Sequence, residues 1–184
     1  MTHQAIIHAT QNWLYTFIIA YNICPFARRV VEQNKLRYHI VASESLEQVL
    51  RELISECRYL DTNPETETTL IILPKGFDDF DDYLDMLALA EQLLVEQDYE
   101  GIYQLASFHP DYCFAETSKN TDDDPANYTN RSPYPMLHII REASIEAAIQ
   151  RYTQPENIPN QNIKLTRALG ASKLQMLLAA CYLR

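Results

Sequence analysis

Residues that carry acid–base and anion-binding groups gather between positions 108 and 141 of this chain. His109 lies near the start of this stretch and His138 near its end. Because an imidazole changes its charge near neutral pH, either histidine could act as a general acid or base. The alternative is a structural histidine that fixes its loop to the sheet. We take His109 and His138 as candidate catalytic residues.

Arg131 and Ser132, which lie between the two histidines, predict a site for a small anion. Ser132 before Pro133 is typical of a helix N-cap, and we expect a helix over residues 132–152. Backbone N–H groups at the start of a helix bind anions, and an arginine guanidinium matches the shape of a carboxylate or phosphate. The predicted pocket therefore lies between the loop 108–131 and the start of the 132–152 helix.

The remaining ligand-binding candidates are Asn127, Asn130 and Arg141. The two asparagines could orient the ligand or pin the loop. On a helix, Arg141 would share a face with His138, three residues earlier. In the alternative interpretation, the asparagines cap turns and Arg131 pairs with an acid such as Asp123.

Cys24 is the third candidate catalytic residue. Pro25 suits the first position of a short helix over residues 25–33, which places the thiol at or next to the helix N-cap. A helix N-terminus and the nearby bases Arg28 and Arg29 would lower the pKa of the thiol and make it reactive. The alternative is a small side chain buried under the residues that follow it.

A metal site is a further alternative, and we predict none. His109 and Cys113, with His138 and the acids of residues 122–124, could form one, but their spacing fits no zinc pattern well. The chain has no GxGxxG, P-loop or GxSxG motif, and three glycines leave little room for a nucleotide-phosphate loop. The cofactor is left unassigned.

Hydrophobic periodicity predicts the elements that position these residues. The expected strands are 37–42, 68–73 and 101–108. The expected helices are 2–21, 25–33, 46–60, 132–152 and 163–182, with a capping box at Ser45 and one more helix that begins at Asp78 or Asp79. This alternation predicts one α/β domain over residues 1–184, with a small, mainly parallel sheet of three or four strands and helices on both faces. A ferredoxin-like α+β arrangement is the structural alternative.

The charge is strongly acidic, with a net charge of −10 and a pI near 4.9. Such a chain is unsuited to nucleic acid or anionic lipid, both of which attract basic surfaces. No apolar run is long enough for a membrane span, the N-terminus lacks the features of a signal peptide, and the four cysteines form no CxxC pair. We therefore expect reduced thiols in the cytoplasm.

Three segments together resemble a known family. They are 22–27 (NICPFA), 105–110 (LASFHP) and 127–141 (NYTNRSPYPMLHIIR). The chain resembles the uncharacterised bacterial and plant family catalogued as domain of unknown function 1415. The resemblance implies a compact cytosolic domain and no particular activity. The matching positions are Cys24, His109, Asn127, Asn130, Arg131, Ser132, His138 and Arg141.

These observations favour a small-molecule enzyme, either a hydrolase or a transferase, that binds an anionic molecule in the predicted pocket. One alternative is a non-catalytic module that binds a metabolite in the same pocket. Another is a protein-interaction domain in which the acidic helix over 78–100 docks a basic partner. The oligomeric state is left open.

Overall fold

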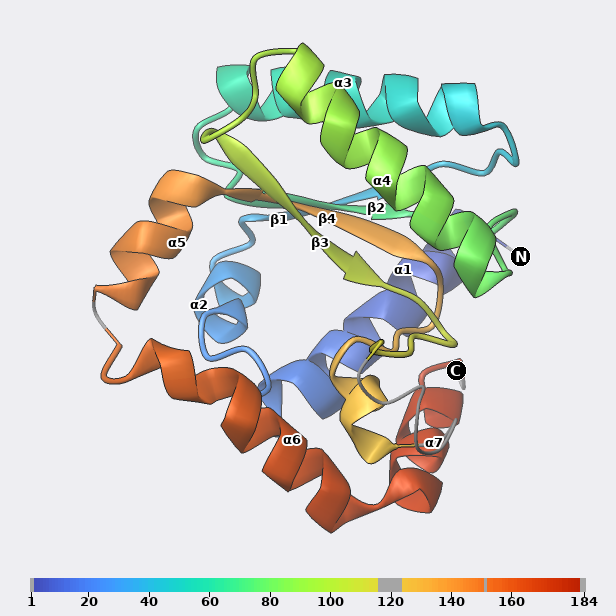
Figure 1. Ribbon diagram of the computed structural model, residues 1–184, viewed down its shortest axis with the longest axis vertical. Coiled ribbons are helices and arrows are strands. Elements are labelled where there is room, and N and C mark those ends of the chain that lie inside the picture. The colour runs from blue at the N-terminus through green and yellow to red at the C-terminus, as the bar shows by residue number, and fades with distance from the viewer. Residues whose placement is uncertain (1, 116–123, 151, 183–184) are drawn as a thin grey trace.

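Four strands form one sheet between two groups of helices in the computed structural model, which describes residues 2–115, 124–150 and 152–182 (Figure 1). The order is β1-β2-β4-β3, where the strands are β1 (Leu36–Ile40), β2 (Thr68–Ile72), β3 (Tyr103–Phe108) and β4 (Met136–Arg141). β1 runs parallel to β2, whereas β4 runs antiparallel to both β2 and β3. β1, β2 and β3 therefore all end at one edge of the sheet, which we call the carboxyl edge.

The α/β architecture with helices on both faces is confirmed, but the sheet is not mainly parallel. β4 lies where the sequence predicts part of a helix over 132–152, and that helix is wrong. Leu137 and Ile139 are fully buried on one face of the sheet and Met136 on the other. A run that is apolar on both faces has no polar side from which its period can be read. Only α5 (Glu142–Ile149) keeps part of the predicted helix.

Two helices, α3 (Leu46–Thr62) and α4 (Phe80–Glu96), cover the upper face of the sheet in Figure 1. Both begin as predicted. The Ser45 side chain accepts a hydrogen bond from the backbone N–H of Gln48, and Asp79 caps α4 in the same way. Side-chain caps of this kind satisfy N–H groups that have no partner within the helix.

The opposite face is covered by α1 (His3–Trp13), α2 (Ala27–Glu32), α6 (Ile158–Leu169), α7 (Ala171–Ala180) and the 3-10 helix η2 (Pro125–Thr129). The helix predicted over 2–21 is α1 continued by a π-helix, η1 (Leu14–Ile19). Gly170, with φ of +81°, separates α6 from α7, so the helix predicted over 163–182 consists of two helices. The short helices α5 and η3 (Pro155–Asn157) connect β4 to α6. None of the helices in the described ranges is long and apolar enough to cross a membrane.

Two adjacent threonines of β2 should respond in opposite directions to the same substitution. Thr69 faces the core below α3, and its hydroxyl is the one buried side-chain N or O atom without a hydrogen-bond partner in the described ranges. The hydroxyl of Thr68 bonds to Nε2 of His138 and to the carbonyl of Ile139. Thr69→Val should therefore raise the free energy of unfolding by about 1 kcal/mol, and Thr68→Val should lower it by about 2 kcal/mol. Urea unfolding of both variants tests this, and a destabilised Thr69→Val would contradict it.

Candidate functional site

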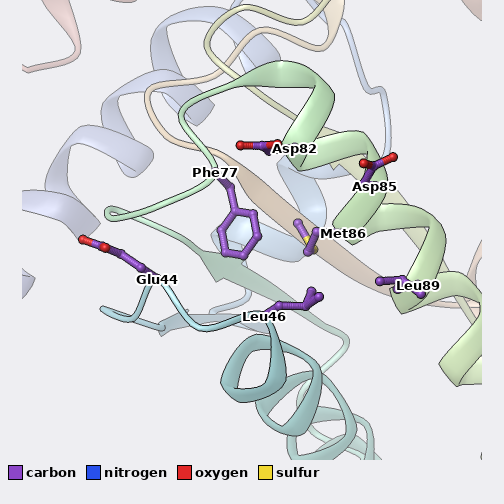
Figure 2. Close-up of a pocket in the computed structure, with 7 residues that line it drawn as sticks. All are labelled: Glu44, Leu46, Phe77, Asp82, Asp85, Met86 and Leu89. Carbon is purple, nitrogen blue, oxygen red and sulfur yellow. The ribbon is translucent and has the colours of Figure 1, made fainter.

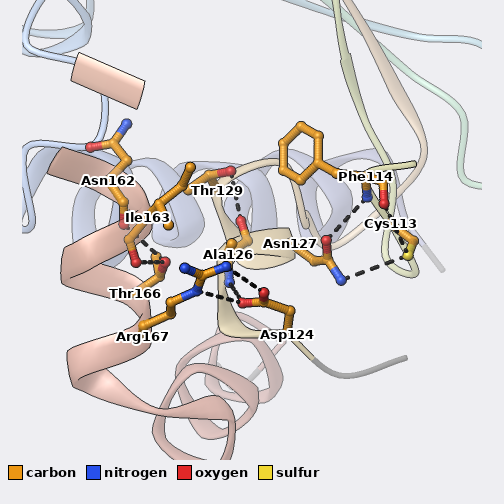
Figure 3. Close-up of polar contacts among 10 residues, drawn as sticks. All are labelled: Cys113, Phe114, Asp124, Ala126, Asn127, Thr129, Asn162, Ile163, Thr166 and Arg167. Atoms are coloured by element: carbon orange, nitrogen blue, oxygen red, sulfur yellow. Dashed lines mark hydrogen bonds and ion pairs between the residues drawn. The ribbon is translucent and has the colours of Figure 1, made fainter. Parts of the chain in front are cut away.

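The polar side chains of the predicted loop site bond mainly to the loop itself. Asn127 is fully buried; its Oδ1 accepts from the backbone N–H of Phe114, and its Nδ2 lies 3.8 Å from Sγ of Cys113 (Figure 3). Asn130 donates to the carbonyl of Ser107. Ser132 is fully buried and donates to the carbonyl of Tyr134. These residues tie the loop to the end of β3 and to itself.

An ion pair anchors the same loop to α6, and sequence reasoning missed it. Asp124 accepts from Nε and Nη2 of Arg167, at 3.2 and 2.7 Å (Figure 3). The guanidinium of Arg167 lowers the pKa of Asp124. The two residues are 43 positions apart. No local pattern in the sequence could have paired them.

Arg131 does not adjoin the start of a helix, so the anion pocket lacks the helix N-terminus on which its prediction depended. Nε of Arg131 donates to the carbonyl of Tyr112 at 3.1 Å, and the guanidinium lies over the ring of Tyr128, 4.6 Å from its centroid. The Arg131 carbonyl accepts from the indole N–H of Trp13. The carbonyl therefore joins the loop to α1, whereas the guanidinium joins two parts of the loop to each other.

Arg141 lies apart from this group. His138 and Arg141 were expected on one helix face, but residues three apart on a strand point to opposite faces. Nη2 of Arg141 donates to the carbonyls of Leu60 and Thr66. The residue thus fixes the end of α3 at the far end of β4 from Arg131.

Cys24 is half-buried and packs against the core below the sheet. The predicted helix after it begins later than expected, at Ala27 with Phe26 as its N-cap residue. Burial raises the pKa of the Cys24 thiol, and the backbone N–H groups of Phe26 and Ala27 offset this only in part. The predicted lowering of the pKa is therefore wrong, because desolvation of the thiolate outweighs the helix terminus.

His109 is fully buried beside α4 and has a hydrogen bond at each ring nitrogen. The backbone N–H of Asp111 donates to Nδ1 at 3.0 Å, so the ring proton is on Nε2, which donates to the carbonyl of Phe77 at 2.9 Å. The ring centroids of Phe80 and Tyr83 both lie 5.1 Å away. Burial lowers the pKa of His109, which favours the neutral ring. This geometry favours the structural alternative for His109.

His138 lies on the other face of the sheet, and nothing brings it together with His109. Its Nε2 lies 2.7 Å from the hydroxyl of Thr68, and the ring of Phe108 has its centroid 6.3 Å away. Desolvation lowers the pKa of His138 to about 4. The imidazole is therefore neutral at physiological pH.

A groove of about 300 Å³ lies at the carboxyl edge, between the loops that follow β1 and β2 and the first turns of α3 and α4 (Figure 2). Three carboxylates and four apolar side chains line it. They are Glu44, Leu46, Phe77, Asp82, Asp85, Met86 and Leu89, and we call this site the α3–α4 groove. Ligands of α/β proteins commonly bind beyond the carboxyl ends of the strands.

Two residues with left-handed backbone shape the groove. A Cβ atom on Gly76, which has φ of +70°, would lie 3.0 Å from Cα of Glu44, so only glycine lets the two loops meet here. Phe77 has φ of +57°, which is rare for a bulky residue. Its carbonyl is the acceptor for His109, and its ring points into the groove (Figure 2). His109 therefore positions a residue of the groove.

The charge of the groove is opposite to the charge expected for an anion site. No lysine or arginine is among its lining residues. Two of its three acids, Asp82 and Asp85, belong to the run between positions 76 and 100 that contains no base. The site predicted from the sequence lies at the same edge of the sheet, but in the loop after β3 and not in the loop after β2, which Pro74-Lys75-Gly76 and the acids after it mark.

No group of three or more His, Cys, Asp or Glu side chains in the described residues could hold a metal ion. Cys113, His109 and His138 are therefore not combined into a ligand set by the parts of the chain that the structure describes. Of the three acids considered as further ligands, residues 122 and 123 lie outside those parts, and Asp124 pairs with Arg167.

Replacing His109 by alanine should lower the free energy of unfolding by about 3 kcal/mol, because it leaves a cavity and removes the hydrogen bond to the Phe77 carbonyl. His3→Ala, at an exposed position, should change it by less than about 0.5 kcal/mol. Urea unfolding measures both. A His109→Ala protein as stable as the wild type would restore the catalytic interpretation.

Acid should destabilise the protein through its buried histidines. The pKa of His138 is lowered from 6.5 to about 4, so the unfolded chain takes up this proton at a higher pH than the folded protein does. Above pH 6.5 the free energy of unfolding does not depend on the protonation of His138. As the pH falls toward 4, the lowered pKa of His138 reduces the free energy of unfolding by about 3 kcal/mol. Urea unfolding across this range gives the free energy of unfolding as a function of pH. The slope of this dependence should be shallower in His138→Gln than in wild type and unchanged in His3→Gln. Equal slopes in wild type and His138→Gln would contradict a neutral His138 imidazole in the folded protein.

Comparison with known proteins supports the resemblance seen in the sequence. A family model described as "Protein of unknown function (DUF1415)" matches residues 5–176. The match covers the whole sheet, all eight predicted site residues and the helices on both faces, except the start of α1 and the end of α7. No curated protein and no solved structure matches the chain. The chain therefore belongs to the DUF1415 family of proteins of unknown function.

Proposed function

We propose that this protein is an interaction domain that binds a basic, partly apolar segment of another protein in the α3–α4 groove. The sequence offered a protein-interaction domain as an alternative, with the whole acidic helix over 78–100 as the binding surface. The proposal keeps that function and limits the surface on this helix to its first turns. The predicted enzyme has less support, because His109, Arg131 and the two asparagines bond to neighbouring groups of the protein.

The observation that carries the proposal is the conformation of Phe77. A bulky residue with positive φ is strained, and such strain persists where the surroundings enforce it, often at a binding site. Here His109 holds the carbonyl of Phe77, and Gly76 packs against Glu44. These contacts hold a half-buried aromatic ring that packs against the core on one side and lines the groove on the other.

The lining of the groove matches the proposed partner in both polarity and charge. Leu46 and Leu89 are 36% and 43% exposed, which is unfavourable unless something covers them. An amphipathic helix could lay its apolar side on these residues and on Phe77, while its lysines and arginines approach Asp82 and Asp85.

The size of the groove favours a segment of protein over a small molecule. Its volume, about 300 Å³, is at the lower limit for small-molecule sites, which are usually more enclosed. The exposed leucines that line it belong to two different helices, Leu46 to α3 and Leu89 to α4, so a docked segment could contact both helices.

A designed amphipathic lysine–leucine peptide with a fluorescent label provides the probe, titrated by anisotropy at physiological salt. The groove variant combines Glu44→Gln, Asp82→Asn and Asp85→Asn. The matched control removes the same charge at distant acids through Glu91→Gln, Asp98→Asn and Glu100→Gln. The groove variant should bind at least about tenfold more weakly than wild type, since each rim charge contributes up to about 1 kcal/mol.

The control variant separates a specific site from general attraction. It should bind within about threefold of wild type, and a peptide with glutamate in place of lysine should not bind. Equal losses in the two variants would mean that only the net charge matters. No binding by wild type would also overturn the proposal.

A further inference from the structure

Two regions of opposite charge in this chain lie on opposite faces of the sheet. Residues 76–100 carry acids and no base, whereas residues 157–182 carry bases and no acid. The first region contains α4 and one wall of the α3–α4 groove, and the second contains α6 and α7. Met86 of the groove packs into the core above the sheet, and Leu174 of α7 packs into the core below it (Figure 1). The groove and α7 therefore cannot meet within one molecule, and a contact between them requires two copies of the chain.

The outward face of α7 presents an apolar side chain next to a base. Met176 is 73% exposed, the largest exposed fraction among the large hydrophobic residues in the described ranges. Lys173 lies three residues earlier and is also exposed, so it shares this face of the helix. Ala180, four residues after Met176, extends the face with a small exposed side chain. The outer side of α7 is thus partly apolar and positively charged, which is the character proposed for the partner of the groove.

The lining of the α3–α4 groove matches both side chains of this face. The ring of Phe77 belongs to its apolar lining, and a methionine such as Met176 is flexible and packs favourably against aromatic rings. Asp82 and Asp85 carry the charge opposite to that of Lys173, and they lie three residues apart on one face of α4. The two surfaces are therefore complementary in both polarity and charge.

We propose that the protein that supplies the segment bound in the groove is a second copy of this chain, which inserts Met176 of α7 beside Phe77. This inference rests on the proposed function, because it names the partner of the same groove. The groove and α7 are different surfaces, so each copy can use both, and the association continues into an open chain or closes into a ring. Because one helix face in one groove is a small interface, the dissociation constant should be on the order of 0.1 mM.

Two variants that each lose one surface test this by sedimentation velocity at physiological salt. The groove variant keeps α7, whereas an α7 variant with Lys173→Gln and Met176→Ser keeps the groove. Wild type should form oligomers as its concentration rises to about 1 mM, and each variant alone should associate at least about tenfold more weakly. An equimolar mixture of the two should form a dimer with nearly the affinity of wild type and nothing larger, because it contains one competent pair of surfaces.

A control variant with Arg29→Gln and Ile149→Ser loses the same charge and another exposed apolar side chain, on α2 and α5. It should self-associate like wild type. The α7 variant should also bind the lysine–leucine peptide as tightly as wild type does, since its groove is intact.

The peptide distinguishes the failure of this inference from the failure of the proposed function. A wild type that binds the peptide but stays monomeric would overturn the second copy as the partner and leave the proposed function intact. Wild-type association in either single variant, or a mixture that forms no dimer, would also overturn the inference.

Discussion

The hydrogen bond from His109 to the carbonyl of Phe77 is the contact on which the carboxyl edge depends. It joins the end of β3 to the loop between β2 and α4, across 32 positions of sequence. Because Nδ1 of the same ring accepts from Asp111, the imidazole also fixes the turn after β3. One side chain thereby holds two loops in place. One of these loops contains Phe77, and its hydrogen bond to His109 helps to hold the left-handed backbone of that residue. The histidine that the sequence suggests for proton transfer thus holds the backbone of a residue that lines the groove.

The hydroxyl of Tyr83 supports this arrangement from α4. It donates to the carbonyl of Met136 at 2.8 Å and accepts from the backbone N–H of Phe108 at 3.1 Å. Tyr83 is fully buried, and its neighbours along α4, Asp82 and Met86, line the groove. The groove wall is therefore fastened to the sheet, which would reduce the ordering cost of binding the proposed partner.

Much of the secondary structure could be predicted from the sequence. The strands over 36–40, 68–72 and 103–108, and the capped starts of α3 and α4, follow from periodicity and from side chains that bond within a few residues. β4 could not be distinguished from a helix, because its apolar residues pack into the hydrophobic cores on both faces of the sheet. The predicted helix therefore made Ser132 an N-cap and placed His138 and Arg141 on one face, and both assignments are wrong. Contacts such as His109 with Phe77 join distant backbone groups, and no residue pattern encodes which carbonyl a buried histidine will meet.

The most direct test of the account is a map of backbone amide shifts on addition of the lysine–leucine peptide to ¹⁵N-labelled protein. If the α3–α4 groove is the binding surface and the polar loop is its support, the largest shifts will fall in residues 44–46 and 77–89, with little change in 127–141. Shifts concentrated in 127–141 would contradict the account and would return the binding site to the loop where the sequence first suggested it.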